Sequence, residues 1–183
     1  MTCIVGLKHK QKIYIGGDSC TTAGYETRAS SQKKVFRIGS ADNGILVGYC
    51  GSARMGQIIR YGVRPPKIKG DVEKYLFRKF IPVLRKTLGK QGWLKQEQNT
   101  DAINDDGRFM VGLKGEIFCI YEDFQVHSVE DNIHSIGSGR NYALGVMLAL
   151  SNEPPKDRIL TALSVAGQLT MSVCAPYYVE SIG

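Results

Sequence analysis

The second residue of the chain, Thr2, could act as a nucleophile. If Met1 were removed, Thr2 would carry a hydroxyl group and an α-amino group on the same residue. An α-amine has an ordinary pKa of about 8, so near neutral pH an appreciable fraction is unprotonated and can accept the hydroxyl proton, directly or through water. Many proteins have threonine in second place for no catalytic reason, so Thr2 gains meaning only from the residues that could join it.

A charged pair that could assist such a nucleophile follows in the first part of the chain. Asp18 comes after an apolar run that ends in two glycines, and Lys34 begins the next apolar run. A lysine ammonium stabilises a developing oxyanion where water is scarce, and a carboxylate holds that lysine in place. Taken alone, Asp18 is better explained as a turn residue and Lys34 as the exposed start of a strand. Lys33 competes with Lys34, but strand neighbours point to opposite faces, so only one can face a site.

Two glycine-rich segments stand where an apolar run gives way to a helical pattern. Gly51 precedes a helix that Ser52 can cap, and the unpaired N–H groups at a helix start favour negative charge. Its N–H is therefore a candidate oxyanion hole, although a glycine needed for a tight turn explains it equally well. The Gly-Ser-Gly segment 137–139 could be a phosphate loop, but no ribose-binding acid follows in a βα unit and the neighbouring strands form a meander.

Apolar periodicity predicts the elements that must position these residues. In the first half, strands are expected at 3–7, 13–17, 34–38 and 45–50, and helices at 52–63 and 71–88. In the second half, strands are expected at 108–113, 116–121, 125–128 and 133–136, helices at 140–151 and 157–173, and a closing strand at 177–182. Antiparallel sheets with separate helix pairs are satisfied by two stacked sheets with helices outside. The expected fold class is therefore α+β, a four-layer αββα sandwich, in a single domain over residues 1–183.

Three local features predict a turn, a kink and a loop within or between these elements. Asn43 and Gly44 between two apolar runs predict a hairpin with a type I′ turn, which needs positive φ at both central residues. Pro82 predicts a kink in the second helix. The polar stretch 89–107 around Trp93 is expected to be an exposed loop or a disordered excursion.

The composition is that of an ordinary globular protein, with 43% hydrophobic and 22% charged residues in 183. No window approaches the roughly 18 consecutive apolar residues of a membrane helix, and the N-terminus lacks the pattern of a secretory signal. We therefore expect a cytoplasmic protein with no membrane association. The five cysteines are an odd number, widely spaced and without a CxxC pair, so we expect free thiols in the core.

The formal net charge of +7 would suit an anionic partner, but the basic residues concentrate in 67–95, where a solvated helix face explains them better. The interleaved aromatic and basic residues of single-strand binders are lacking, which argues against nucleic acid as a partner. His9, His127 and His134 share no metal-ligand spacing. We therefore expect neither a metal nor a cofactor.

Five spaced motifs together are more specific than any one of them. They are TCIVGL at 2–7, IGGDS at 15–19, KKV at 33–35, GYCGSA at 48–53 and IGSG at 136–139. At these residues the sequence resembles the proteasome β-subunit family of N-terminal-nucleophile hydrolases, and within it the bacterial HslV-like branch. The resemblance covers nearly the whole chain with matching element order and is weakest from 65 to 107.

The resemblance implies a role for each candidate residue. Thr2 would be the nucleophile after removal of Met1, Asp18 would orient the lysine, and Lys34 would make the Thr2 alkoxide less costly to form. The N–H of Gly51 would form the oxyanion hole, and Ser138 would bond near the threonine amine and assist proton transfer.

The resemblance also implies a first specificity pocket. Its lining would be Cys20, Thr21, Tyr49 and Ala53, and we expect hydrophobic or uncharged substrate side chains to fit there.

The sequence departs from the family pattern near its end. Gln168 stands where the resemblance leads us to expect an acidic residue at the start of the final site motif. Thr170 or Ser172 could still supply a hydroxyl near Thr2. The missing acid bears on catalytic competence and not on the fold.

The expected function is that of a threonine-type endopeptidase subunit that cleaves peptides or unfolded proteins through an acyl-enzyme on Thr2. The resemblance implies a self-compartmentalising homo-oligomeric ring and, for some relatives, an ATP-dependent unfoldase as partner. The alternative is a catalytically inactive scaffold or ring subunit, which is motivated by Gln168 and predicts that Met1 is retained. A third possibility, an anion-binding or nucleic-acid-binding module, predicts affinity that falls steeply with salt.

Overall fold

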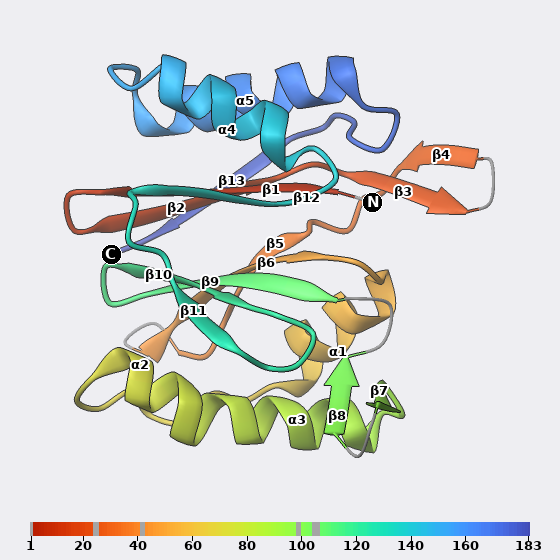
Figure 1. Cartoon of the computed structure of the whole chain (residues 1–183), viewed down its shortest axis with the longest axis vertical. Helices are drawn as coiled ribbons and strands as arrows, with labels where there is room; N and C mark the ends of the chain where they lie inside the picture. The colour runs from red at the N-terminus through yellow and green to blue at the C-terminus, as the bar shows by residue number, and fades with distance from the viewer. Residues whose placement is uncertain (1, 24–25, 41–42, 98–99, 104–106) are drawn as a thin grey trace.

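Two antiparallel sheets lie face to face at the centre of the molecule, and helices cover their outer faces (Figure 1). The computed structural model describes residues 2–23, 26–40, 43–97, 100–103 and 107–183. The upper sheet has the order β12 (Ile133–Gly137), β1 (Cys3–His9), β2 (Lys12–Gly17) and β13 (Tyr178–Ile182). The lower sheet has the order β11 (Val126–Ser128), β10 (Glu116–Ile120), β9 (Arg108–Leu113), β6 (Ile45–Cys50) and β5 (Val35–Ile38). Helices α4 (Arg140–Ala149) and α5 (Pro155–Leu169) cover the upper sheet, and α1 (Ala53–Gly62), α2 (Val72–Tyr75) and α3 (Ile81–Lys90) cover the lower one. The predicted αββα sandwich is confirmed.

The strands of the upper sheet are apolar on both faces because both faces are buried. In β1, Cys3, Val5 and Leu7 pack under α4 and α5, whereas Ile4 packs between the two sheets. Successive strand residues point to opposite faces, so this division follows from the alternation along the strand. The upper sheet is therefore covered on both faces, by the helices on one side and by the lower sheet on the other.

Two glycines allow the sheets to approach closely. A Cβ atom on Gly48 of β6 would stand 2.7 Å from Cγ2 of Ile4 and 2.8 Å from Cγ2 of Ile15. A Cβ atom on Gly17 of β2 would stand 2.7 Å from Cδ1 of Ile4 and 2.9 Å from Cγ2 of Val35. Side chains at these two positions would force the sheets apart. The end of β2 can therefore lie against the start of β5.

The helices below the lower sheet begin and break where the sequence indicates. Ser52 caps α1, because its side chain accepts a hydrogen bond from the N–H of Arg54 at 3.1 Å. The predicted helix at 71–88 is divided into α2, the π-helical segment η2 (Leu76–Phe80) and α3, with Pro82 in the first turn of α3. Proline has no N–H to donate to the preceding turn, which explains the changed hydrogen-bond pattern just before it. The predicted kink is thus an interruption of the helix.

The final helix differs from its predicted bounds at both ends. Helix α5 begins at Pro155, since proline suits the first turn, and it ends at Leu169 instead of residue 173. Residues 171–173 therefore lie beyond the helix, and Ser172 among them contacts Ser138, which is bonded to Thr2.

The β5–β6 hairpin is confirmed, but its predicted type I′ turn at Asn43–Gly44 is wrong. Gly44 does not have the positive φ that such a turn requires, whereas Gly39 does, at 90°. Asn43 instead uses its amide to fix another segment: Nδ2 donates to the carbonyl of Pro66 at 3.0 Å, and Oδ1 accepts from the N–H of Ile68 at 2.6 Å. The competing side-chain bonds account for the different loop.

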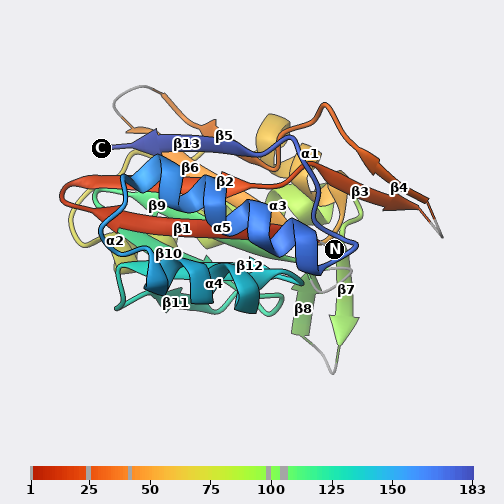
Figure 2. The same ribbon diagram turned by 90° about the horizontal axis from the view of Figure 1, so that it is seen from above.

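Two hairpins project from the sandwich, and neither was predicted from the sequence (Figure 2). β3 (Cys20–Ala23) pairs with β4 (Glu26–Ala29), and β7 (Leu94–Glu97) pairs with β8 (Thr100–Ile103). The second hairpin corrects the expectation of a loop or disordered excursion at 89–107, of which 98–99 and 104–106 lie outside the described residues. Trp93 and Leu94 pack against the lower core and Ile103 is fully buried, so tertiary burial stabilises a segment with little apolar periodicity of its own.

Across the ranges that the structure describes, no helix has the length and apolar character needed to span a bilayer.

Candidate active site

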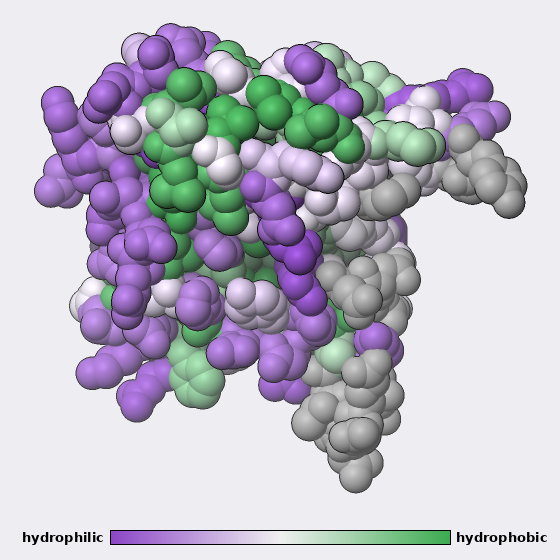
Figure 3. Space-filling view, turned by 45° about the horizontal axis from the view of Figure 1, so that its top comes forward, coloured by the Kyte–Doolittle hydropathy of each residue, from purple (hydrophilic) through white to green (hydrophobic). Residues whose placement is uncertain are grey.

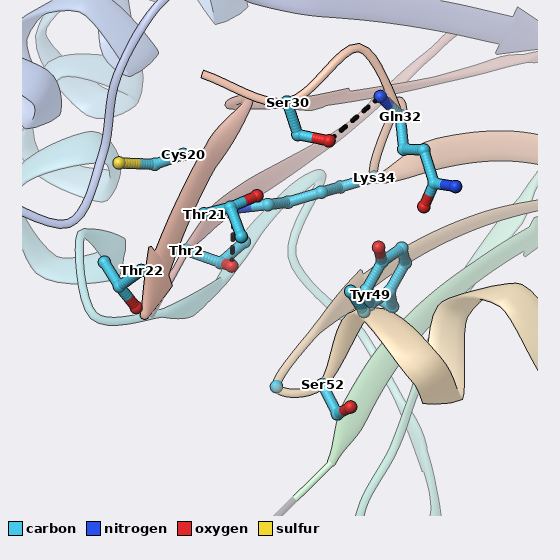
Figure 4. A pocket seen from close by; sticks show the side chains of 11 residues that line it. Thr2, Cys20, Thr21, Thr22, Ser30, Gln32, Lys34, Tyr49 and Ser52 are labelled. Atoms are coloured by element: carbon cyan, nitrogen blue, oxygen red, sulfur yellow. Dashed lines mark hydrogen bonds between the residues drawn. The ribbon is translucent and has the colours of Figure 1, made fainter. Parts of the chain in front are cut away.

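The ends of three strands bring Thr2, Asp18 and Lys34 together. Thr2 directly precedes β1 and Asp18 directly follows β2, and these neighbours are antiparallel, with Ile4 opposite Gly17. Lys34 directly precedes β5 and lies one residue outside the strand in which it was expected. Figure 4 shows its side chain running to the hydroxyl of Thr2.

The lysine joins the other two side chains through short bonds. Nζ of Lys34 lies 2.8 Å from Oγ1 of Thr2, and 3.1 and 3.0 Å from Oδ1 and Oδ2 of Asp18. Thr2 is 1% exposed, Asp18 is fully buried and Lys34 is 7% exposed. A buried charge is tolerated when it is paired and hydrogen-bonded. This geometry places the lysine nitrogen against the threonine oxygen at a position largely buried from solvent.

Backbone donors hold the carboxylate of Asp18 from the side away from the lysine. The N–H of Cys3 donates to Oδ1 at 2.9 Å, and the N–H of Cys20 donates to Oδ2 at 2.8 Å. Both carboxylate oxygens thus have a backbone partner as well as the Lys34 ammonium. The orientation of Asp18, and through it that of Lys34, is fixed by the strand ends.

Ser138 lies on the nitrogen side of Thr2. The N–H of Thr2 donates to Oγ of Ser138 at 3.2 Å, and that Oγ also lies 3.2 Å from the carbonyl oxygen of Thr2. Gly137, with φ of 95°, brings the chain so close that a Cβ there would stand 2.2 Å from the Thr2 carbonyl oxygen. The structure places Ser138 beside the nitrogen that would become the α-amine. Met1, whose removal would create that amine, lies outside the described residues.

Ser172, and not Thr170, is the hydroxyl that joins this group. Oγ of Ser172 lies 2.7 Å from Oγ of Ser138, and the residue is 5% exposed. Oγ1 of Thr170 donates to the carbonyl of Ala166 at 3.0 Å and remains tied to α5. The exposed Gln168 lies within α5, so its position supplies no carboxylate to the site. The sequence left both hydroxyls open because the end of the helix was placed too late.

A cavity of about 390 Å³ opens beside Thr2. All four predicted pocket residues line it, namely Cys20, Thr21, Tyr49 and Ala53. The other lining residues come from β3, the 30–32 segment and the start of α1 and were not predicted to line it: Thr22, Ser30, Gln32 and Ser52. The lining side chains other than Lys34 are uncharged, and burial raises the pKa of Tyr49 above its ordinary value. The wall suits a neutral side chain.

Gly51 lies on the wall of the same cavity with φ of 104°, a conformation that residues with a Cβ rarely adopt. It directly precedes Ser52 and the first N–H groups of α1. Its backbone is therefore near Thr2 at a helix start, and its role as an oxyanion donor remains a prediction.

Two competing residues are engaged elsewhere. Nζ of Lys33 pairs with Glu180 at 3.1 Å and lies over the ring of Tyr178, so Lys34 is the lysine that faces Thr2. Burial raises the pKa of the Cys3 thiol to about 12, and its Sγ contacts the hydroxyl of Ser135. A protonated, enclosed thiol is a poor nucleophile.

The comparisons agree with the fold and with the motifs. No family model matches the chain. The ATP-dependent protease subunit HslV of Pediococcus pentosaceus is 25% identical over 173 residues, which cover 92% of this chain and 87% of that protein. A solved structure of Thiobacillus denitrificans BPH in complex with epoxomicin has a TM-score of 0.78 and 18% identity, over 98% of this chain and 97% of that one.

HslV from Trypanosoma brucei is also similar in fold, with a TM-score of 0.67 and 19% identity over 98% of each chain. The sandwich, the strand-end position of Thr2 and the sequence similarity to HslV point to the same group of proteins. The chain therefore has the fold of proteasome-like and HslV-like N-terminal-nucleophile hydrolases and is similar in sequence to HslV.

Proposed function

We propose that the protein is a threonine-type endopeptidase subunit whose nucleophile is Thr2 after removal of Met1. The observation that carries the proposal is the 2.8 Å bond from Nζ of Lys34 to Oγ1 of Thr2, with Asp18 holding the lysine from behind. A buried ammonium at this distance lowers the free energy of an alkoxide or oxyanion at Thr2.

In the proposed reaction, Oγ1 of Thr2 attacks the carbonyl carbon of a peptide bond and its proton passes to the free α-amine. Ser138, 3.2 Å from that nitrogen, can relay the proton, and Ser172 fixes its hydroxyl. The Gly51 N–H stabilises the oxyanion. The amine then protonates the leaving nitrogen, which gives an ester on Thr2, and a water activated by the same amine hydrolyses it.

The cavity supports a preference for a neutral residue on the acyl side of the cleaved bond. Thr21, Tyr49 and Gln32 offer hydroxyl and amide groups, and none of the described residues that line the cavity is a carboxylate. A basic substrate side chain would find no partner there, and an acidic one would meet a lysine that is already paired. The substrate class that fits is an unfolded protein or peptide with an uncharged residue at this position.

In this proposal the chain is a single domain, it acts in the cytoplasm, and several copies associate into a ring. Apolar residues gather on the part of the surface that Figure 3 shows over α4. Tyr142, Leu148, Leu169 and Met171, all from α4, α5 or the residues just after, are exposed large hydrophobics. Such a surface is typical of an interface. The similarity to an ATP-dependent protease subunit supports an unfoldase as a partner.

Peptide hydrolysis by the protein freed of Met1 tests the proposal. Thr2→Ala should abolish turnover of a fluorogenic peptide with a neutral residue before the cleaved bond, and Lys34→Ala should reduce it at least about 100-fold. Lys33→Ala is the matched control and should stay within about twofold of the parent, because this lysine pairs with Glu180 at the surface. Substantial turnover in Thr2→Ala would exclude this nucleophile.

A second candidate is a catalytically inactive ring or scaffold subunit, which Gln168 favours because its position on α5 supplies no acid. This candidate predicts normal assembly and no peptide turnover in the protein freed of Met1. The same assay, read beside the mass of the assembly, separates the two functions.

A further inference from the structure

Two cysteines that are far apart in the sequence meet beside the candidate site. All five cysteines are free thiols. The Sγ of Cys20 lies 3.9 Å from the carbonyl oxygen of Met171, and Cys20 is near enough to Cys174 to raise the pKa of its thiol. Cys20 begins β3 and lines the cavity, and Figure 4 shows its sulfur directed away from Thr2. Cys174 lies between α5 and β13 and is half-buried.

The backbones that carry these thiols are already joined. The N–H of Ser19 donates to the carbonyl of Cys174 at 3.0 Å, and the hydroxyl of Ser19 donates to the carbonyl of Pro176. A disulfide joins residues whose Cα atoms lie about 4.4–6.8 Å apart, a range that residues next to a backbone hydrogen bond between two segments can reach.

We propose that Cys20 and Cys174 are a latent disulfide site that a peroxide closes. One thiol, as thiolate, attacks a peroxide oxygen, the O–O bond breaks, and a sulfenic acid and water result. The second thiol attacks the sulfenic sulfur, the S–O bond breaks, and a second water leaves with the thiol proton. Two thiols and one hydrogen peroxide thus give one disulfide and two waters.

The disulfide clamps the two segments that flank the site. Asp18 stands two residues before Cys20, and Ser172 stands two residues before Cys174. The bond closes a loop of about 150 residues, so it removes much of the conformational freedom of the unfolded chain. The proposal does not depend on Thr2 being catalytic, and its test is separate from the peptidase assay.

The environment sets the rate of the reaction. Burial, followed by the neighbouring Cys20, raises the pKa of Cys174 to about 12, so this thiol stays protonated near neutral pH. Because the thiolate is the reacting form, closure should take minutes to hours and not seconds.

The test is treatment of the reduced protein with hydrogen peroxide, followed by intact mass and a non-reducing peptide map. We expect a mass lower by about 2 Da and a Cys20–Cys174 cross-linked peptide, both reversed by dithiothreitol. The oxidised protein should unfold at a temperature higher by about 5–15 °C than the reduced protein. Cys20→Ser and Cys174→Ser should each prevent both changes, whereas Cys119→Ser, a buried thiol of β10, should prevent neither.

Three results would overturn the inference. One is addition of oxygen at Cys20 or Cys174 in the wild-type protein without a cross-link. Another is a cross-link to a different cysteine. The last is no change in mass after hours in peroxide. All three results are measured on the wild-type protein, so they remain valid even if a serine variant folds poorly.

Discussion

Removing either partner of the buried ion pair between Asp18 and Lys34 should destabilise the protein strongly. The fully buried carboxylate and the 7% exposed lysine are stable as a pair because each neutralises the other and backbone N–H groups complete the shell. Removing one partner strands the other charge in a medium of low dielectric constant.

Asp18→Asn should therefore lower the free energy of unfolding by about 3–5 kcal/mol, measured by urea denaturation. Glu180→Gln is the control, because it breaks the exposed ion pair with Lys33 and should cost less than about 1 kcal/mol. Equal effects of the two substitutions would mean that the Asp18 pair contributes no more than a surface pair.

Ser172 should affect peptide turnover through its contact with the Ser138 hydroxyl. Ser172→Ala removes the 2.7 Å partner of the Ser138 hydroxyl, so peptide turnover should fall about 3-fold to 10-fold. Thr170→Ala is matched to it, since the Thr170 hydroxyl donates to the carbonyl of Ala166 in α5, and should change kcat by less than about twofold. Comparison of kcat values in the protein freed of Met1 checks this, and a larger loss in Thr170→Ala would contradict it.

At the scale of the element, the site depends on how closely the two sheets approach. Gly48→Ala would place a methyl group 2.7 Å from Cγ2 of Ile4 and 2.8 Å from Cγ2 of Ile15, and both are packed core side chains. We expect a loss of about 1–3 kcal/mol in stability, measured by urea denaturation.

Gly145→Ala is the matched control for Gly48→Ala. Gly145 lies in α4 with open space where a Cβ would go, so alanine should stabilise the helix by about 0.5–1 kcal/mol. A neutral Gly48→Ala would show that the sheets have room to separate at this position.

The sequence predicted the buried elements well and the projecting ones poorly. Strands such as β1 and β6 show apolar runs because both faces are buried, and the sequence places them within a residue or two. The hairpins β3–β4 and β7–β8 are polar segments whose pairing depends on contacts that local periodicity does not contain. The β-branched Thr21, Thr22 and Thr27 were the available signal for the first of them.

The sequence predicted the site residues that lie in recognisable motifs and missed those that do not. Thr2, Asp18, Lys34 and Ser138 lie in short motifs that carry the family resemblance, and the structure brings all four together. Gln32 and Ser172 could not be assigned, because they reach the site from segments whose path is set by tertiary packing.

At the scale of the whole molecule, the two outer helical layers differ in chemistry. The segment 64–90 contains nine Lys and Arg against two Asp and Glu, so it carries the entire formal net charge of +7. Its basic side chains on α2, η2 and α3 are exposed, which confirms the prediction of a solvated helix face. The opposite layer, α4 and α5, exposes the large apolar side chains of Tyr142, Leu148 and Leu169, whereas Phe77 on the basic layer is surrounded by exposed Lys and Arg.

The proposed self-association is expected to use the apolar layer. Leu148→Glu, on α4, should reduce the assembly to smaller species in size-exclusion chromatography with light scattering, because it buries a charge in the interface. Phe77→Glu is the matched control: Phe77 is 69% exposed against 68% for Leu148, but it lies on the basic layer and should leave the assembly unchanged. The opposite pattern would place the interface on the basic layer.

The most direct test of Thr2 as the nucleophile is the intact mass of the purified protein before and after incubation with a peptide epoxyketone, which needs both the hydroxyl and the free amine of an N-terminal threonine. A chain that has lost Met1 and gains one stoichiometric adduct, absent in Thr2→Ala, is the predicted result. A chain that has lost Met1 and gains no adduct would contradict the proposed mechanism. If Met1 is still present, removing it with methionine aminopeptidase should restore labelling, and failure to do so would contradict the mechanism equally.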